Sequence, residues 1–128
     1  MQKIKSVCVR TAMLVCTLML GYGIANAQCT TQVGNYSTCT GPKFLSISSN
    51  NCEAGYYGTS QFTITVTVNQ TGASYNVYPG YGATLVSSSV SGTTLTYVIQ
   101  KASGVTSAGL AVHMASPCQN NFVSITIE

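Results

Sequence analysis

The sequence predicts an all-β fold, an antiparallel β-sandwich of about seven short strands held by two disulfides. Apolar and polar side chains alternate with a period of two in stretches such as FTITVTV at residues 62–68, which is typical of a strand with one buried face. Such stretches recur at intervals of roughly 8–12 residues, the spacing of a sandwich. A small closed barrel is the alternative arrangement of the same strands.

The first 27 residues have the three parts of a secretory signal peptide. A basic start is followed by an apolar run at 12–20 and by the small residues of Ala25-Asn26-Ala27. The apolar run is short for a bilayer, so a retained membrane anchor is the less favoured alternative. We therefore expect residues 1–27 to be removed, leaving no membrane span, and the mature protein to be secreted or held at the cell surface.

Cleavage leaves a chain with almost no net charge. Its charged side chains are two lysines and two glutamates, at Lys43, Lys101, Glu53 and Glu128. Binding to nucleic acid requires clustered cations that replace the counterions of the phosphates. The charge pattern excludes nucleic acid and anionic membrane surfaces as expected partners.

Four cysteines follow the cleavage site, at Cys29, Cys39, Cys52 and Cys118. An even number in an exported chain indicates two disulfides, with three possible pairings. A zinc site is the rival interpretation, but the chain has no Cys-x-x-Cys pair and one histidine, so we expect no metal. The 101 residues that remain (128 minus 27) suit a single domain.

The expected elements begin with an irregular lead-in at residues 28–43, which is rich in Thr, Ser and Gly, and continue in a sandwich domain at 44–128. Residues 44–49 alternate and predict a first strand with Leu45 and Ile47 inward. Residues 60–69 give the clearest strand, because β-branched residues occupy both faces. Its inward side chains are Phe62, Ile64, Val66 and Val68.

Five more strands are expected, each bounded by Gly, Pro or a loop. They begin near residues 75, 84, 94, 110 and 122. The apolar side chains assigned to a buried face are Tyr75, Val77, Leu85, Val90, Leu95, Tyr97, Ile99, Leu110, Val112, Met114, Val123, Ile125 and Ile127.

The order of these motifs resembles the PKD-like and immunoglobulin-like modules of bacterial secreted and cell-surface proteins. The resemblance covers Cys52 to Ile127 and rests on FTITVTV, GASYNVYPGYGATLVSSSVSGTTLTYVI, AVHMASPC and VSITI in that order. It implies an immunoglobulin-like sandwich. It also implies that Cys52 bonds Cys118, which leaves Cys29 to bond Cys39.

The sequence offers little for catalysis. The mature chain has no aspartate, so paired carboxylates for acid-base chemistry or calcium binding are not expected. His113 is the single candidate base, and alternation places it on the outward face of its strand. No Gly-x-Ser-x-Gly elbow is present. We expect neither an enzyme nor a cofactor.

The favoured function is that of a structural or adhesive module that acts outside the cell through contacts with another protein or with copies of itself. The final strand, VSITIE, is expected to form an open sheet edge where copies could pair. A plain immunoglobulin-like domain with an unspecified protein partner is an equal alternative.

Carbohydrate recognition is the other hypothesis. Tyrosines in or beside expected loops can stack on sugar faces and hydrogen-bond through their hydroxyls. The candidate ligand contacts are Tyr56, Tyr57, Tyr78 and Tyr81, with Tyr36 as a further loop tyrosine, whereas Tyr75 and Tyr97 are expected in the core.

Overall fold

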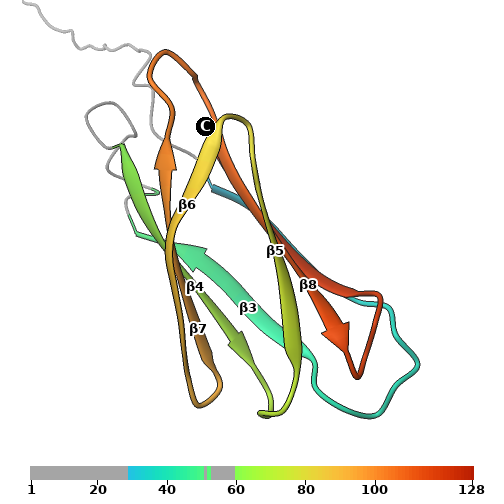
Figure 1. Ribbon diagram of the computed structural model, residues 1–128. Coiled ribbons are helices and arrows are strands. Elements are labelled where there is room, and N and C mark those ends of the chain that lie inside the picture. The colour runs from blue at the N-terminus through green and yellow to red at the C-terminus, as the bar shows by residue number, and fades with distance from the viewer. Residues whose placement is uncertain (1–28, 51, 53–59) are drawn as a thin grey trace, which may run out of the picture.

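The computed structural model describes residues 29–50, 52 and 60–128, which form two four-stranded antiparallel sheets (Figure 1). The strand order is β3-β4-β7-β6 in the first sheet and β2-β9-β8-β5 in the second. Two separate sheets confirm a sandwich and exclude the barrel. The strands are β2 (Cys29–Asn35), β3 (Phe44–Ser49), β4 (Gln61–Val68), β5 (Ser74–Gly80), β6 (Ala83–Ser91), β7 (Thr94–Lys101), β8 (Ala108–Ser116) and β9 (Asn121–Ile127).

The strand order is that of an immunoglobulin constant-type domain, in which one sheet reads A-B-E-D and the other C-F-G. Strands β3, β4, β7 and β6 take the places of A, B, E and D, and β5, β8 and β9 those of C, F and G. The predicted immunoglobulin-like sandwich is therefore confirmed, with β2 as an additional strand beside β9. The predicted signal peptide at 1–27 lies outside the described residues.

Strand β2 shows that the expectation of an irregular lead-in at 28–43 is wrong for residues 29–35, whereas residues 36–43 contain neither strand nor helix. It pairs with β9 along its whole length, from Cys29 opposite Ile127 to Asn35 opposite Asn121. Its sequence, CTTQVGN, does not alternate, and most of its side chains are exposed. Backbone hydrogen bonds to β9 hold it in place, so the hydrophobic pattern contains no sign of it.

The position of β9 corrects a second expectation. The last strand is not an open edge, because it pairs with β2 on one side and with β8 on the other. The edge strands among the described residues are β3 and β6 in one sheet and β2 and β5 in the other. Strands β2 and β3 are neighbours across the sandwich. Strands β5 and β6 border the opposite side, which we call the open flank.

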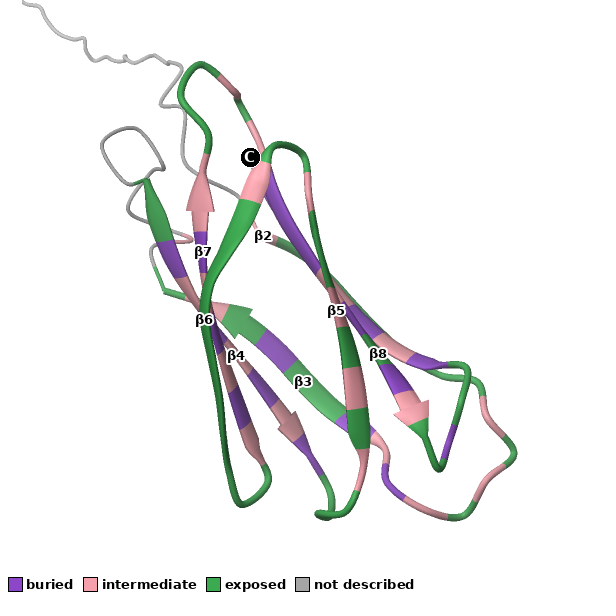
Figure 2. Ribbon diagram, viewed as in Figure 1, coloured by how far each residue is buried: buried purple, intermediate pink, exposed green. Residues whose placement is uncertain are grey.

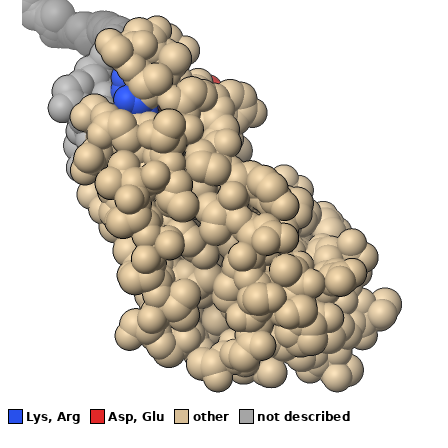
Figure 3. Space-filling view, in the orientation of Figure 1, with Lys and Arg blue, Asp and Glu red and all other residues tan. Residues whose placement is uncertain are grey.

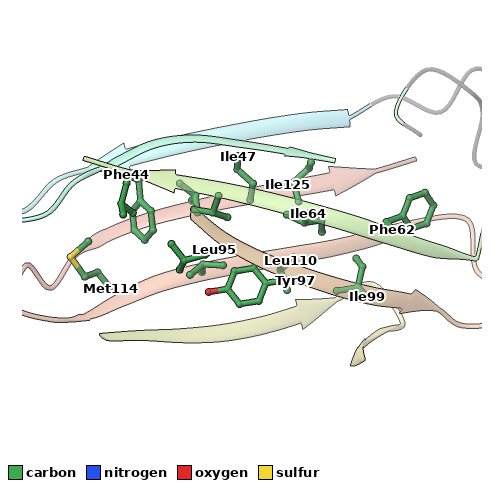
Figure 4. Close-up of a cluster of buried hydrophobic side chains, with 14 of the residues drawn as sticks. Phe44, Ile47, Phe62, Ile64, Leu95, Tyr97, Ile99, Leu110, Met114 and Ile125 are labelled. Atoms are coloured by element: carbon green, nitrogen blue, oxygen red, sulfur yellow. The ribbon is translucent and has the colours of Figure 1, made fainter. Parts of the chain in front are cut away.

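The core lies between the sheets and is built from alternate residues of the central strands (Figures 2 and 4). The period-two pattern therefore predicted the inner faces of β4, β7, β8 and β9. The buried residues of these strands include Phe62, Ile64, Val66, Val68, Leu95, Tyr97, Ile99, Leu110, Val112, Met114, Val123, Ile125 and Ile127.

Strand β3 departs from simple alternation. Ile47 is buried as expected, but Leu45 is 61% exposed and Phe44 is buried in its place. The pairing with β4 shifts between Phe44 and Ser46, which places one extra residue in β3. Such a bulge changes which side chains face inward, so the inward assignment of Leu45 is wrong.

The disulfides join Cys29 to Cys52 and Cys39 to Cys118, with Cα–Cα distances of 5.4 and 5.3 Å. All four predicted cysteines are bonded, but the expected pairing of 29 with 39 and 52 with 118 is wrong. Strand β2 starts at Cys29, and its seven residues extend the chain by roughly 20 Å. A disulfide requires Cα atoms closer than about 7 Å, so β2 carries the chain away from Cys29 before it reaches Cys39.

Candidate functional site

The outer face of the β2-β9-β8-β5 sheet carries a row of aromatic side chains. Phe122 points outward because its neighbours Asn121 and Val123 are buried, and His113 points outward between Val112 and Met114 for the same reason. Phe122 and His113 are directly opposite each other on β9 and β8. The register therefore places residues from separate strands on one surface.

The rings form a continuous series across the sheet. The ring centroids of Tyr36 and Phe122 are 5.8 Å apart, those of Phe122 and His113 are 5.7 Å apart, and those of His113 and Tyr78 are 5.2 Å apart. The Tyr78 and His113 rings meet edge to face, with an interplanar angle of 82°. These separations lie in the range of favourable aromatic pairs. We call Tyr36, Phe122, His113 and Tyr78 the aromatic row.

A glycine makes room for one end of the row. Gly34 lies opposite Phe122 on β2. A Cβ atom at Gly34 would stand 2.5 Å from Cε1 of Phe122 and 2.6 Å from Cε2 of Tyr36, far closer than atoms can pack. The absent side chain therefore lets both rings lie against the backbone of the sheet.

Tyr81 extends the aromatic surface beyond β5. It adopts a left-handed backbone conformation with φ of 57°, and Gly82 follows with φ of 81°. This conformation costs a tyrosine on the order of 1 kcal/mol. It folds the ring back over β8, where a Cβ at Gly109 would lie 2.8 Å from Cδ2 of Tyr81. Tyr81 thus has a strained backbone conformation although its side chain remains 65% exposed.

An open hollow of about 220 Å³ lies beside Tyr78 and Tyr81. Its other lining residues are small or apolar, and none carries a formal charge. They are Gly80, Gly109, Leu110, Ala111, Ser124, Ile125 and Thr126. The hollow thus combines two tyrosine rings with the hydroxyls of Ser124 and Thr126.

The structure brings three of the sequence-predicted tyrosines to this face. Tyr36 belongs to the aromatic row, and Tyr78 and Tyr81 border the hollow. Tyr56 and Tyr57 lie outside the described residues. Phe122 and His113 were not among the predicted ligand contacts. Alternation places both outward, but only the pairing of β8 with β9 brings them together.

Tyr97 and Tyr75 belong to the interior. Tyr97 is buried on β7, whereas Tyr75 is partly buried on β5 and packs against Phe44 with ring centroids 5.8 Å apart. Burial, and to a lesser extent the nearby Tyr75 phenol, raises the pKa of Tyr97 to about 12. Burial also raises the pKa of Tyr75 above its usual value. Neither phenol is an accessible ligand contact of the row.

The open flank is the second exposed apolar surface. Leu85 and Val90 of β6 are opposite Ile99 and Leu95, whose side chains fill the core. Leu85 and Val90 therefore both lie on the inner side of the sheet, although they are an odd number of residues apart, because the pairing shifts by one residue between Leu85 and Ser87. They are nevertheless 39% and 65% exposed, because the edge of the facing sheet does not cover β6.

Metal-binding and membrane-spanning features are not found in the part of the chain that the structure describes. No group of three or more His, Cys, Asp or Glu residues gathers there. All four cysteines downstream of residue 27 form disulfides, so none of these thiols is free to bind a metal. Within residues 29–50, 52 and 60–128 no helix has the length and apolar character needed to cross a bilayer.

Comparisons with known proteins give no match: no family model fits the chain, and neither the curated proteins nor the solved structures include one with significant similarity.

Proposed function

We propose that this protein is an exported, non-catalytic adhesive module that binds a neutral carbohydrate chain on its aromatic face. The observation that carries the proposal is the convergence of Tyr36, Phe122, His113 and Tyr78 in one row that leads to the hollow beside Tyr81. Two disulfides in about a hundred residues are compatible with an oxidising, extracellular environment.

The chemistry of the face suits sugars. Exposed aromatic rings offer apolar surface to the C–H faces of a pyranose, and the tyrosine hydroxyls can hydrogen-bond to its edges. The hollow adds hydroxyl groups from Ser124 and Thr126. No lysine, arginine or carboxylate lines it, which favours a neutral sugar over a charged one.

The size of the hollow also favours a sugar chain over a protein anchor. Pockets for drug-sized ligands have volumes of about 300–1,000 Å³ and bury most of the ligand. The hollow measures about 220 Å³ and is open. It therefore suits one sugar ring of a chain whose neighbouring rings rest on the aromatic row.

Contact with another protein is the competing function for this face. Tyrosine is enriched at protein interfaces, so exposed aromatic side chains also favour that role. Gly34 lies beneath Phe122 and Tyr36 at one end of the row, and the hollow at the other end is small and open, which offers few deep sites for a protein side chain. We therefore place protein contacts on a different surface, described below.

The test is an array of neutral oligosaccharides probed with the purified, disulfide-intact mature chain, followed by calorimetric titration of any ligand that binds. Tyr78→Ala removes one ring and should weaken binding by roughly tenfold, since a ring contact of this kind contributes about 1 kcal/mol or more. Leu45→Ala is the matched control, because Leu45 is similarly exposed but lies on β3 in the other sheet. An array without any hit, or equal losses for both variants, refutes the proposal.

A further inference from the structure

Strand β6 is an edge strand with only one of the features that usually prevent edge pairing, a register shift between Leu85 and Ser87 that leaves Val86 without a partner on β7. It runs nine residues, from Ala83 to Ser91, with no proline and no charged side chain, and eight of the nine are exposed. Natural proteins normally protect such edges with charges, prolines or covering segments, because an open edge offers unpaired backbone groups to another strand. The molecular face in Figure 3 is almost free of charged side chains.

The other edge strands are protected. Strand β5 contains Pro79, which has no N–H to donate. The β2 and β3 edges lie against each other, and they are tied by a disulfide from Cys29 to Cys52 and by hydrogen bonds between Asn35 and Phe44. Among the described residues β6 is thus the edge best suited to add a strand.

The sequence of β6 is complementary to itself. From Ser87 to Ser91 it pairs with β7 without a register shift, so this part of the edge is regular. An antiparallel copy centred on Ser88 would place Val86 opposite Val90 of the second copy and Ser87 opposite Ser89 of the second copy. Near the centre, each valine would then be opposite a valine and each serine opposite a serine, without any charge repulsion.

We propose that two copies of this chain associate through β6, in antiparallel register about a two-fold axis at Ser88. The contact joins the two β3-β4-β7-β6 sheets into one continuous eight-stranded sheet. It is isologous, so it closes as a dimer and leaves no further β6 edge for a third copy.

Association through β6 also covers the open flank. Leu85 and Val90 lie on the inner side of β6 but are exposed, and Tyr75 and Val77 on the inner side of β5 are only partly buried. A second copy seated on β6 brings its own flank against these residues. The apolar surface that the single chain leaves in water then becomes part of a shared interior.

The experiment measures association of the mature chain by sedimentation velocity over a wide concentration range. The wild-type chain is expected to shift from monomer to dimer as concentration rises. Val90→Lys should raise the dissociation constant at least tenfold, since it places a lysine against Val86 of the other copy. Leu45→Lys is the matched control at an exposed site of β3 and should leave the equilibrium unchanged.

A charge pair tests the register. In the proposed dimer the double variant Val86→Glu/Val90→Lys forms two Glu–Lys pairs across the two-fold axis, so it should recover the association that Val90→Lys loses. Ser88→Cys should form a disulfide between two copies, because residue 88 faces its own counterpart. Peptide mapping of that variant should still find the native Cys29–Cys52 and Cys39–Cys118 bonds.

Three results overturn the proposal. They are a wild-type chain that stays monomeric at every concentration, equal effects of Val90→Lys and Leu45→Lys, and failure of the charge pair to restore association. Because the aromatic row lies on the other sheet, monomeric Val90→Lys should bind carbohydrate as the wild type does. Failure of one proposal is therefore distinguishable from failure of the other.

Discussion

Asn35 and Phe44 exchange two hydrogen bonds, one in each direction. Asn35 Nδ2 donates to the carbonyl oxygen of Phe44 at 2.8 Å, and the Phe44 N–H donates to Asn35 Oδ1 at 2.9 Å. Asn35 ends β2 and Phe44 begins β3, so one amide joins the edge strands of the two sheets. This contact helps to close the side of the sandwich opposite the open flank.

We expect Asn35→Ala to lower the free energy of unfolding by about 1–3 kcal/mol, because it leaves two partly buried backbone groups of Phe44 without their partner. Denaturant unfolding measures the loss. Asn76→Ala is the control at an exposed asparagine of β5 and should change stability by no more than about 0.5 kcal/mol. Equal effects at both positions would contradict the assigned role of Asn35.

Asn121 has a similar role at the same end of the sandwich. Its side chain is fully buried, accepts a hydrogen bond from the Ser37 N–H at 2.9 Å and donates to the Pro42 carbonyl oxygen at 3.2 Å. Asn121→Leu should therefore lower stability more than Asn35→Ala does, because it leaves the buried Pro42 carbonyl and the partly buried Ser37 N–H unpaired and places a branched side chain in a fully buried site. Unfolding of the two variants under the same conditions gives the comparison.

The two disulfides should contribute unequally to stability. Cys39–Cys118 closes a separation of 79 residues and Cys29–Cys52 one of 23. On the chain-entropy estimate the longer loop is worth about 4–5 kcal/mol and the shorter about 3 kcal/mol. The pair Cys39→Ser/Cys118→Ser should thus unfold at lower denaturant concentration than Cys29→Ser/Cys52→Ser. The reverse order would show that strain or denatured-state structure outweighs loop length.

Alternation predicted the parts of the fold where one face of a strand is buried along its length. Phe62 to Val68 on β4 is the clearest case, since every second side chain is in the core. The pattern could not reveal β2, because an edge strand with exposed side chains depends on backbone bonds to a distant partner. Nor could it reveal the bulge that buries Phe44 in place of Leu45.

The candidate site shows the same limit. Alternation alone places His113 outward on its strand, but it does not say that Phe122 is opposite it or that Tyr78 is on the adjacent strand. Those relations follow from the order of the strands in the sheet, which is set by contacts between residues far apart in the sequence. The disulfide pairing failed for the same reason, since it depends on where β2 carries Cys29 and Cys39.

Tyr97 should make stability depend on pH in the alkaline range. Burial raises the pKa of its phenol to about 12 in the folded chain, against 10.0 for an exposed tyrosine. Between these values the unfolded chain binds fewer protons than the folded chain, so stability is intact below pH 10 and falls as the pH rises towards 12. The expected loss of stability from this residue is at most about 3 kcal/mol, since each pKa unit corresponds to about 1.4 kcal/mol.

Unfolding of wild type and Tyr97→Phe across this pH range tests the assignment. The variant has no ionisable phenol at residue 97, so its stability should fall less steeply. A smaller decline of stability with rising pH should remain in the variant, since burial also raises the pKa of Tyr75. Parallel profiles for the two proteins would contradict a dominant role of Tyr97.

Gly34→Ala should disturb the aromatic row without removing any ring. The new methyl group would stand 2.5 Å from Phe122 and 2.6 Å from Tyr36, so both rings must move away from the sheet. Because Tyr36 is 68% exposed and can rotate into solvent, we expect little loss of stability but roughly tenfold weaker carbohydrate binding. Leu45→Ala, at an exposed site of β3 in the other sheet, is the control and should bind as the wild type does. Titration calorimetry gives both affinities, and near-ultraviolet circular dichroism reports the movement of the rings.

One outcome would contradict binding along the whole aromatic row: unchanged affinity in a Gly34→Ala protein whose aromatic circular dichroism signal has changed. The ligand would then not rest on the Tyr36 end of the row, and the binding site would be confined to the hollow beside Tyr78 and Tyr81.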